Sequence, residues 1–462
     1  MVLKFGIAAA ALLAAGGAAA QTGAKHEAEA RGLFEKAISF RTAQGQGQVP
    51  KMAAWLGERL RAGGVPAEDI VILPHEQTAA MIVRIPGRNA EARPILFSGH
   101  MDVVDARPED WKRDPFTLVE ENGYFYGRGT GDNKAGVVAL ASTVLRLKAS
   151  GRKPARTLVF AFVGDEETTF GTTRLIAAHP WVKDAEFAIN TDAGGGTLTE
   201  NGKPLMYSVQ GAEKTYATFK LTARNPGGHS SRPRGDNAIY DLAEALVRIK
   251  GYGFPAMSNA LTRSYFGVLG KVLPGDEGAV VRRFAANPED PQAITALRRN
   301  PGLVGTIATT CVATMLDAGH AENALPQRAE ATVNCRIFPG ISVESVQAKL
   351  VEVVANKDIV VAVTGNPQAS PVSEPRADVM GAIAKSVHAR YPGLPITPYQ
   401  ESGGTDGVIY RSAGIPTYAS SGLFYRESDI FFHGLDERVS ARSFYEGVEH
   451  VHDLAVTLGG VK

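Results

Sequence analysis

The 462-residue sequence contains only two cysteines, Cys311 and Cys335, and no excess of charge of either sign. Two cysteines cannot build a disulfide scaffold or a structural zinc knuckle, so any bound metal must be held by His, Asp and Glu. With 49 basic and 48 acidic residues and no run of five like charges, the chain lacks the features that hold nucleic acid. We therefore expect a small, neutral or zwitterionic partner.

Long hydrophobic runs are also absent, except near the amino terminus. There Lys4 precedes an apolar run over 5–15, and small residues follow. The run is broken by Gly16 and Gly17 and is shorter than the roughly 20 residues that span a bilayer. This order is typical of a signal peptide over 1–20. The sequence thus predicts export to the periplasm or the medium, and no stable membrane span in the mature chain.

Short apolar runs of strand length alternate with segments of helical spacing, which predicts an α/β fold with a mainly parallel sheet covered on both sides. The pattern changes in the middle of the chain and returns near its end, so a second domain interrupts the first. We expect a catalytic domain over 21–208 and 372–462, and a smaller α+β lid or dimerisation domain over 209–371. Within it, residues 251–305, rich in Pro, Gly and Arg, are expected to form an insertion with short helices.

Histidine or acidic side chains directly follow three of the predicted strands. They are His100 and Asp102 after the strand at 95–97, Glu166 and Glu167 after 157–163, and Asp192 after 187–189. Taken alone, each of these residues could belong to an ordinary loop without a metal. Adjacent carboxylates repel unless a cation is present, and open α/β sheets place ligand sites beyond the carboxyl ends of their strands. The coincidence therefore favours a cation site.

Two further residues could join this site. Asp132 follows the glycine-rich segment 127–131 and opens a predicted helix, where the plain alternative is a helix N-cap. A phosphate loop is excluded because no Gly-Lys-Ser/Thr follows the glycines. His433 lies in a polar turn near the carboxyl terminus and alone would be a surface histidine. Together the chain offers two histidines and at least three carboxylates for metal binding.

An ordered set of motifs runs along nearly the whole mature chain. The motifs are Ser98-Gly99-His100-Met101-Asp102-Val103-Val104, Gly127-Arg128-Gly129 through Asp132, Gly164-Asp165-Glu166-Glu167, Asp192, Gly227-Gly228-His229-Ser230-Ser231, Asn323-Ala324-Leu325-Pro326, Arg336, Gly403-Gly404-Thr405-Asp406 and His433-Gly434. This set resembles the co-catalytic zinc peptidase family of glutamate carboxypeptidase, aminoacylase, carnosinase and peptidase T. The insertion and the segments at 324–326 and 334–336 are most similar to the branch of carboxypeptidase S and the secreted N-acyl-amino-acid hydrolases.

The resemblance implies a site with two zinc ions, for which cobalt or manganese are the alternative metals. It assigns His100 and Asp192 to one ion, Glu167 and His433 to the other, and Asp132 to both. Glu166 would be the general base and Asp102 would orient His100. The resemblance also implies a cis peptide bond between Asp132 and Asn133.

The resemblance further implies four substrate-binding residues, which are His229, Asn323, Arg336 and Gly404. His229 would stabilise the oxyanion, commonly in the active site of the partner subunit, so we expect a homodimer. Arg336 would hold a substrate carboxylate, and an ordinary strand arginine in an ion pair is the alternative. Ser230 is not expected to be a nucleophile, because no Gly-x-Ser-x-Gly elbow accompanies it.

Two departures from the family pattern leave the substrate open. Acylases and carboxypeptidases often carry Glu at the position of Asp192, whereas Asp is more usual there in dipeptidases, and the insertion at 251–305 is long. The leading hypothesis is a carboxypeptidase or dipeptidase that releases a C-terminal amino acid. The enzymatic alternative is an N-acyl-amino-acid amidohydrolase. An inactive peptide-binding homologue is a remote third, because no ligand or base position is lost in this sequence.

The two cysteines are candidates for a disulfide. They flank the turn at Asn323 on predicted neighbouring strands, and export would expose them to oxidant. The register of the strands is not given by the sequence, so both the bonded and the free state stay open at this point.

Overall fold

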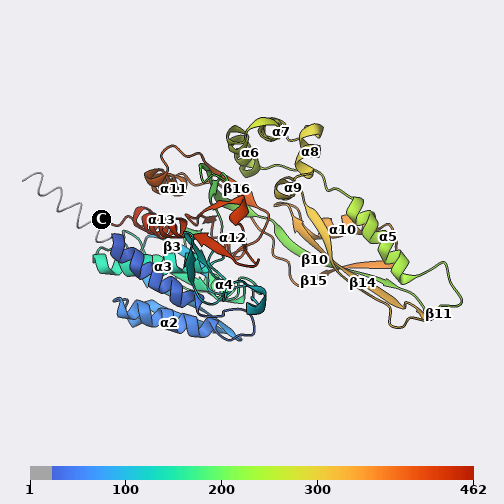
Figure 1. The fold of residues 1–462 in the computed structure, drawn as a ribbon, viewed down its shortest axis with the longest axis horizontal. Coiled ribbons are helices and arrows are strands. Elements are labelled where there is room, and N and C mark those ends of the chain that lie inside the picture. The colour runs from blue at the N-terminus through green and yellow to red at the C-terminus, as the bar shows by residue number, and fades with distance from the viewer. Residues whose placement is uncertain (1–22) are drawn as a thin grey trace, which may run out of the picture. The chain divides into compact units, whose positions relative to one another are not determined.

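The computed structural model describes residues 23–462, and the predicted signal peptide at 1–20 lies outside them. The larger sheet has ten strands in the order β1-β2-β6-β3-β7-β17-β9-β8-β18, with β16 paired to β9 (Figure 1). The strands are β1 (Ile70–His75), β2 (Thr78–Ile85), β3 (Ile95–His100), β6 (Leu158–Val163), β7 (Phe187–Asn190), β8 (Gly195–Leu198), β9 (Pro204–Glu213), β16 (Ile396–Glu401), β17 (Thr417–Ala419) and β18 (Phe424–Arg426). Among residues 23–462, no helix has both the length and the apolar composition needed to cross a membrane.

The centre of this sheet is parallel and fully buried. β3 pairs in parallel with β6 on one side and with β7 on the other, while β1 and β2 add an antiparallel edge. All residues of these three central strands are buried, which explains their continuous apolar sequence. The predicted α/β fold class with a mainly parallel sheet is confirmed.

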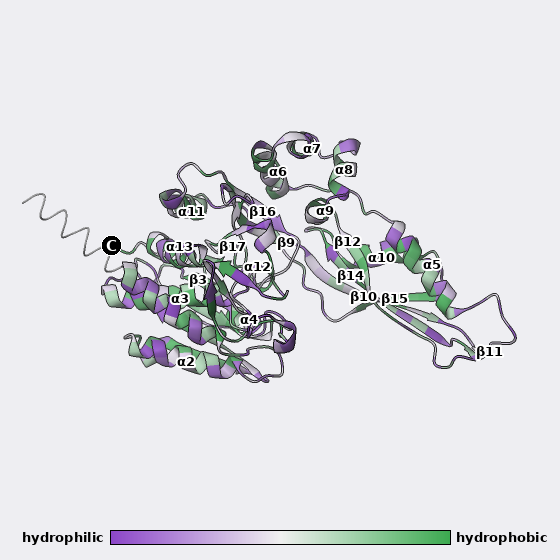
Figure 2. Ribbon diagram, in the orientation of Figure 1, coloured by the Kyte–Doolittle hydropathy of each residue, from purple (hydrophilic) through white to green (hydrophobic). Residues whose placement is uncertain are grey.

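The helices around this sheet follow from apolar residues at helical spacing. They are α2 (Val49–Ala62), α3 (Lys134–Ser150), α4 (Gly171–Ala178), α11 (Ala377–Arg390), α12 (Gly407–Ser412) and α13 (Ala441–Gly459). Figure 2 shows hydrophilic and hydrophobic residues alternating along α2, whose apolar side packs on β2. By contrast, α3 packs against both β3 and α13 and is buried along most of its length.

A second, antiparallel sheet has the order β12-β14-β10-β15. Its strands are β12 (Thr310–Ala318), β14 (Arg328–Ile337), β10 (Thr215–Arg224) and β15 (Ile359–Thr364). Along β14 buried and partly exposed residues alternate, and the buried side joins an apolar cluster with α5 (Ala238–Gly251) and α10 (Val343–Val354). The other face of the sheet is accessible and mixes polar side chains with exposed apolar ones, among them Val312, Met315 and Val360.

The expected short helices of the insertion are present. They are α6 (Ala260–Val272), α7 (Gly275–Ala286), α8 (Pro291–Arg298) and α9 (Pro301–Ile307). Their apolar residues form a small core of their own, which includes Phe266, Phe284 and Ile307. Asn and Asp side chains cap α6, α8 and α9 by accepting hydrogen bonds from the first-turn backbone N–H groups.

By compactness the chain forms two units. Unit 1 contains the chain up to Tyr207 together with Arg376–Leu394 and Ala419–Lys462, and unit 2 contains Ser208–Pro375 and Pro395–Tyr418. The catalytic and lid domain ranges given from the sequence remain predictions.

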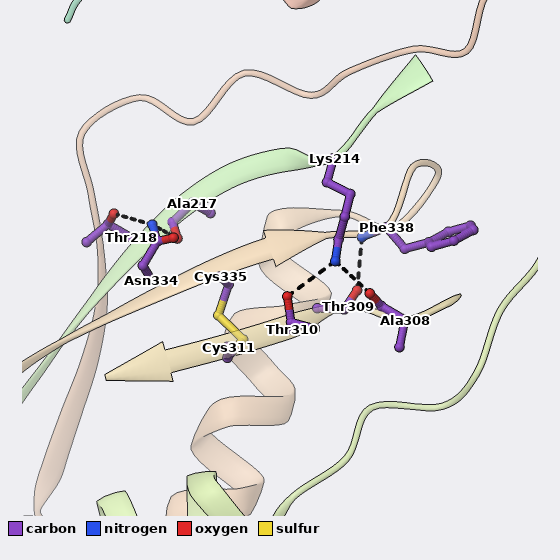
Figure 3. The surroundings of a disulfide bond; sticks show 10 residues. All are labelled: Lys214, Ala217, Thr218, Ala308, Thr309, Thr310, Cys311, Asn334, Cys335 and Phe338. Carbon is purple, nitrogen blue, oxygen red and sulfur yellow. Dashed lines mark hydrogen bonds between the residues drawn. A yellow bond between two sulfur atoms is a disulfide. The ribbon is translucent and has the colours of Figure 1, made fainter. Parts of the chain in front are cut away.

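The two cysteines form a disulfide in unit 2. Cys311 on β12 lies directly opposite Cys335 on β14, and the two Cα atoms are 4.1 Å apart (Figure 3). The disulfide that the sequence left open is thus confirmed, and the strand register supplies the missing reason.

Reduction of this disulfide is expected to lower the stability of unit 2 by about 3 kcal/mol, because the bond closes a loop in the unfolded chain. The two residues are 24 positions apart. Denaturant unfolding with and without reductant measures the loss, and a Cys311→Ser, Cys335→Ser double variant should show no response to reductant. Two titratable thiols in denatured, unreduced protein would contradict the assignment.

Candidate metal centre

The carboxyl ends of three neighbouring strands assemble half of the site. His100 is the last residue of β3, Glu166 and Glu167 follow β6, and Asp192 follows β7. Because β3 is the middle strand and runs parallel to both neighbours, these three strand ends meet at one edge of the sheet. His100 Nε2 accordingly lies 3.3 Å from Asp192 Oδ1.

A small three-stranded sheet brings the other half together. It has the order β19-β5-β4, with bounds Arg438–Ser440, Tyr124–Tyr126 and Val119–Glu121. β5 pairs antiparallel with β19, and Arg438 lies opposite Tyr126. This pairing places the segment before β19, which carries His433, beside the glycine-rich segment after β5, which leads to Asp132.

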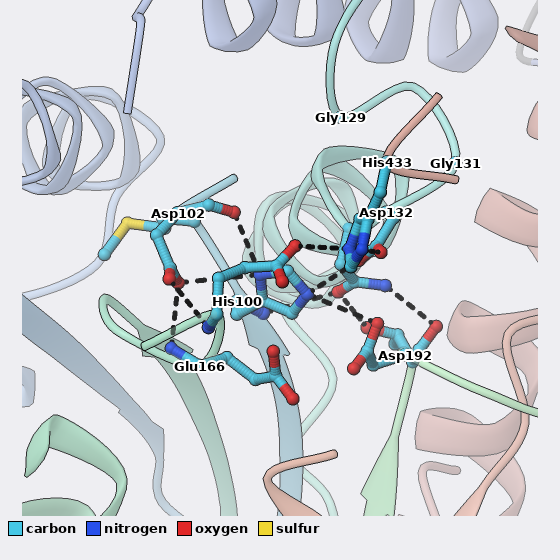
Figure 4. A network of polar contacts seen from close by, with 12 residues as sticks. His100, Asp102, Gly129, Gly131, Asp132, Glu166, Asp192 and His433 are labelled. Atoms are coloured by element: carbon cyan, nitrogen blue, oxygen red, sulfur yellow. Dashed lines mark hydrogen bonds and ion pairs between the residues drawn. The ribbon is translucent and has the colours of Figure 1, made fainter. Parts of the chain in front are cut away.

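Five expected ligands form two groups that share Asp132. His100, Asp132 and Asp192 make one group, and Asp132, Glu167 and His433 make the other, with ligand atoms of each group within 4.8 Å of one another. The two oxygens of Asp132 point to different histidines: Oδ1 lies 2.9 Å from His100 Nε2, and Oδ2 lies 3.0 Å from His433 Nε2 (Figure 4). Asp132 is thus the carboxylate that the two groups share.

The donor set of this cluster suits zinc. Imidazole nitrogens and carboxylate oxygens, without thiolates, are the ligands of co-catalytic zinc and also accept cobalt or manganese. The described residues therefore include a cluster that fits a metal ion of this kind. The peptide bond between Asp132 and Asn133 is cis, as the family resemblance implied.

Asp102 supports two parts of the site at once. The imidazole Nδ1 of His100 lies 2.9 Å from the backbone carbonyl oxygen of Asp102 and 3.5 Å from its carboxylate. The carboxylate itself accepts the backbone N–H groups of Glu166 and Glu167, at 3.1 and 3.0 Å. Asp102 thus orients the ring of His100 mainly through its backbone. Its side chain fixes the turn that carries Glu166.

Glu437 is a structural partner that the sequence analysis did not identify. Its buried carboxylate accepts backbone N–H groups from Gly129, Gly131 and Asp132 and pairs with Arg128 at 2.8 Å. It therefore holds the glycine-rich turn in the shape that presents Asp132. More than 300 residues separate Glu437 from this turn, so no local signal could have revealed the contact.

The protonation of the cluster reflects its dense negative charge. Burial lowers the pKa of His100, but Asp192 and hydrogen bonds to the carboxylates raise it well above its usual value. Hydrogen bonds to Asp132 and Glu167 raise the pKa of His433 to about 10. Burial, reinforced by neighbouring carboxylates, raises the pKa of Asp192 to about 7. Bound protons therefore offset the negative charge of the carboxylates in this cluster, and divalent cations would offset the same charge.

Zinc binding is therefore expected to release protons, because ligating imidazoles must be neutral. With the pKa values of both histidines raised and that of Asp192 at about 7, loading at pH 7 should release about two protons per chain from His100 and His433 and part of a third from Asp192. Because protons compete with zinc for these rings, the apparent zinc affinity should rise with pH between 6 and 9. Calorimetry in buffers of different ionisation enthalpy measures the release, and a His433→Ala variant should release fewer protons. Loading without proton release would contradict this picture.

Arg336 and Gly404 come together in unit 2. The guanidinium of Arg336 lies over the ring of Tyr216, with the central carbon 4.7 Å from the ring centroid. A Cβ atom at position 404 would lie 3.9 Å from Arg336 Nη1, so glycine keeps the space beside the guanidinium open.

His229 and Asn323 also come together, but far from Arg336. His229 on β11 (Gly228–His229) pairs antiparallel with β13 (Ala324–Leu325), and the carbonyl of Asn323 accepts the N–H of Ser230 at 3.0 Å. Both side chains are exposed. β11 follows one end of β10, whereas Arg336 lies opposite Tyr216 near the other end. Unit 2 therefore separates the expected substrate residues into two sets.

The chain is similar to known proteins over most of its length. The family model described as Peptidase family M20/M25/M40 matches residues 96–457. The human N-fatty-acyl-amino acid synthase/hydrolase PM20D1 is 28% identical over 379 residues, which cover 80% of this chain and 75% of that protein. Probable carboxypeptidase S-like 2 of Dictyostelium discoideum is 27% identical over 391 residues, 81% of this chain and 73% of that protein. The fold is similar to that of the metallo-carboxypeptidase Sso-CP2 of Sulfolobus solfataricus, with a TM-score of 0.70, 18% identity and coverage of 93% and 99%.

Proposed function

Because this chain belongs to peptidase family M20/M25/M40, a family of metal-dependent hydrolases, we propose that it is an exported enzyme that cleaves an amide bond next to a free carboxylate. The product would be the C-terminal amino acid of a dipeptide or short peptide. The observation that carries the proposal is the pair of ligand groups sharing Asp132, with Glu166 beside them. Export is inferred from the sequence at 1–20.

The metal ligands are proposed as follows. His100 and Asp192 would hold one zinc ion, Glu167 and His433 the other, and Asp132 both. Bound there, the ions would lower the pKa of a shared water toward neutrality and polarise the amide carbonyl.

Glu166 is proposed as the general base. It is 9% exposed, and its backbone is held by Asp102, so the carboxylate is presented from a fixed turn. Glu166 would take a proton from the attacking water and return it to the departing amine. Its neighbour Glu167 cannot share this role while it serves as a ligand.

The substrate would be held by residues of unit 2. Arg336 would bind the free carboxylate, since a planar guanidinium offers two parallel N–H groups, and Gly404 would leave room for it. The exposed ring of His229 accepts the backbone N–H of Ser231 at Nδ1, 3.1 Å away. The other nitrogen then carries a hydrogen, as an oxyanion donor requires. Asn323, which directly precedes the β13 strand paired with His229, is proposed to bind the substrate beside it.

The second candidate function is hydrolysis of an N-acyl amino acid. It is favoured by the similarity to the human N-fatty-acyl-amino acid synthase/hydrolase, at 28% identity over most of both chains. The same metal centre and carboxylate site would serve both reactions, and only the acyl side of the substrate would differ.

One experiment tests the proposal and separates the two candidates. Zinc-loaded protein is incubated with a panel of dipeptides and N-acyl amino acids, and the products are identified by mass. Release of a free amino acid that stops after chelation and resumes with zinc supports the proposal, and the acyl group of the best substrate selects the candidate. Ser230→Ala is the matched control and should remain active. Turnover that survives chelation, or no release from any member, refutes the proposal.

A further inference from the structure

Lys214 is a buried cation at the junction of β9 and β10. The residue is 2% exposed. Its Nζ donates to the carbonyl oxygen of Ala308 at 2.7 Å and to Thr310 Oγ1 at 3.3 Å (Figure 3). Both acceptors are neutral, and an ammonium group has a third N–H to donate. A buried charge of this kind is costly unless an anion joins it.

The preceding carboxylate does not supply that anion. Glu213 is fully buried and directs its side chain to the other side, where it accepts both the N–H and the hydroxyl of Thr405, at 2.7 and 3.0 Å. Its second oxygen forms an ion pair with Arg411. Glu213 is thus satisfied within a network of its own.

A second cation lies near Lys214. Arg336 lies directly opposite Thr310 in the β12–β14 pair, and Thr310 is the residue that accepts from Lys214. Burial, followed by the positive charge of Arg336, lowers the pKa of Lys214 to about 7. The charge of Arg336 thus reaches Lys214, and an anion beside the buried amine would be stabilised.

The β16 end and helix α9 both pack against Lys214. The N–H of Lys214 donates to the carbonyl of Glu401 at 3.2 Å, which ties it to the loop that contains Gly404. On the opposite side stands α9, the last helix of the insertion. A Cβ atom at Gly305 of this helix would lie 2.4 Å from Ser402 Oγ and 3.9 Å from Lys214 Nζ. The insertion therefore packs against the same loop and lies beside the ammonium group.

We propose that Lys214 is a specificity-determining residue that binds the carboxylate of the substrate together with Arg336. The two cations would select amides of amino acids whose carboxyl group is free over the corresponding carboxamides. This inference rests on the proposed function, because the bound carboxylate belongs to the substrate that the metal centre cleaves. It adds a second cation, contributed by the β9–β10 junction and placed beside the insertion.

The site should couple carboxylate binding to proton uptake. Above pH 7 the empty site holds Lys214 largely neutral, and an arriving carboxylate raises its pKa, so the amine takes up a proton. Affinity should therefore be constant below about pH 7 and weaken above it. Four titratable or charged groups lie on the elements around Lys214: Arg336 on β14, Tyr216 on β10, Glu401 on β16 and Glu213 on β9. The carboxylate of Glu401 accepts hydrogen bonds from Ser402, Gly403 and Tyr399. Glu213 is paired with Arg411.

Kinetics of three variants test the proposal. The substrates are the fastest N-acyl amino acid or dipeptide of the panel and its C-terminal carboxamide. Lys214→Met should raise KM for the acid at least about tenfold, leave kcat within about threefold, and leave kcat/KM for the carboxamide unchanged. Lys214→Arg should restore the preference for the acid. Lys220→Met is the matched control, because Lys220 lies on β10 in an exposed ion pair with Glu330, and it should behave as the parent.

Calorimetry gives a readout that a merely structural lysine would not change. Zinc-loaded Glu166→Gln protein should take up about one proton on binding the acid at pH 8, and the Glu166→Gln, Lys214→Arg protein should take up none. Equal loss of activity on acid and carboxamide in Lys214→Met, or proton uptake that is unchanged in the arginine variant, would overturn the proposal. Acids that bind but are not hydrolysed would refute only the proposed function. If no acid of the panel binds, both fail.

Discussion

Protein carrying Glu166→Gln is expected to bind both metals and to lose at least about a hundredfold in kcat. The change removes the proton acceptor but keeps the size of the side chain, and general base catalysis is typically worth 10²–10⁴-fold. The backbone N–H of residue 166 would still donate to Asp102, as Glu166 does now at 3.1 Å, so the turn should keep its shape. Metal analysis beside steady-state kinetics measures both quantities on one sample.

The neighbouring position supplies the matched control. Glu167→Gln alters the adjacent residue, whose carboxylate lies 3.0 Å from His433 Nε2 in the second ligand group. It should reduce metal occupancy as well as turnover, whereas Glu166→Gln should reduce turnover alone. If the Glu166 variant keeps more than about a tenth of the activity, or loses a metal, the assignment of the base is wrong.

The strand-end half of this site could be predicted because its signals are local. A buried strand in a parallel sheet is a continuous apolar run, so the ends of β3, β6 and β7 were visible in the sequence, and His100, Glu166 and Asp192 stood directly at them. The order β6-β3-β7, which makes the three ends adjacent, came only with the structure.

The other half depends on contacts across long stretches of chain. His433 meets Glu167 across 266 residues; the sequence alone offered it as a histidine in a polar turn, and the family resemblance assigned it to the site. Neither the local sequence signals nor the family resemblance identified Glu437 and Lys214. Neither residue lies in a matching motif, and each contacts backbone groups that are distant in the sequence. The disulfide could be predicted only in part. The sequence indicated the two strands that carry Cys311 and Cys335, but their register, which places the cysteines opposite each other, came from the structure.

The separation of His229 from Arg336 bears on how a substrate could meet both. Register places Tyr216 opposite Arg336 and Arg224 opposite Arg328, and His229 follows five residues after Arg224. Eight residues of extended strand span roughly 26 Å. The backbone of a dipeptide is at most about 7 Å long. If both residues bind one small substrate, they must therefore come from two copies of the chain.

We therefore predict a homodimer in which His229 completes the active site of the partner subunit. His229→Ala and Glu166→Gln proteins should each be nearly inactive. After mixing and subunit exchange, a hybrid dimer would contain one site with an intact Glu166 and an intact His229, and one site that lacks both. Equal mixing should make about half of the dimers hybrids, so activity should return to about a quarter of the parent value.

The recovery must depend on exchange and not on mixing alone. Differently tagged subunits allow hybrids to be isolated, and the hybrid fraction should carry all of the regained activity. Ser230→Ala mixed with Glu166→Gln is a useful reference, because its subunits keep His229 and should gain nothing beyond dilution. If isolated hybrids remain inactive, His229 does not act across the interface. Since β10 already holds it far from Arg336 in its own chain, a role in binding the same substrate would then be excluded.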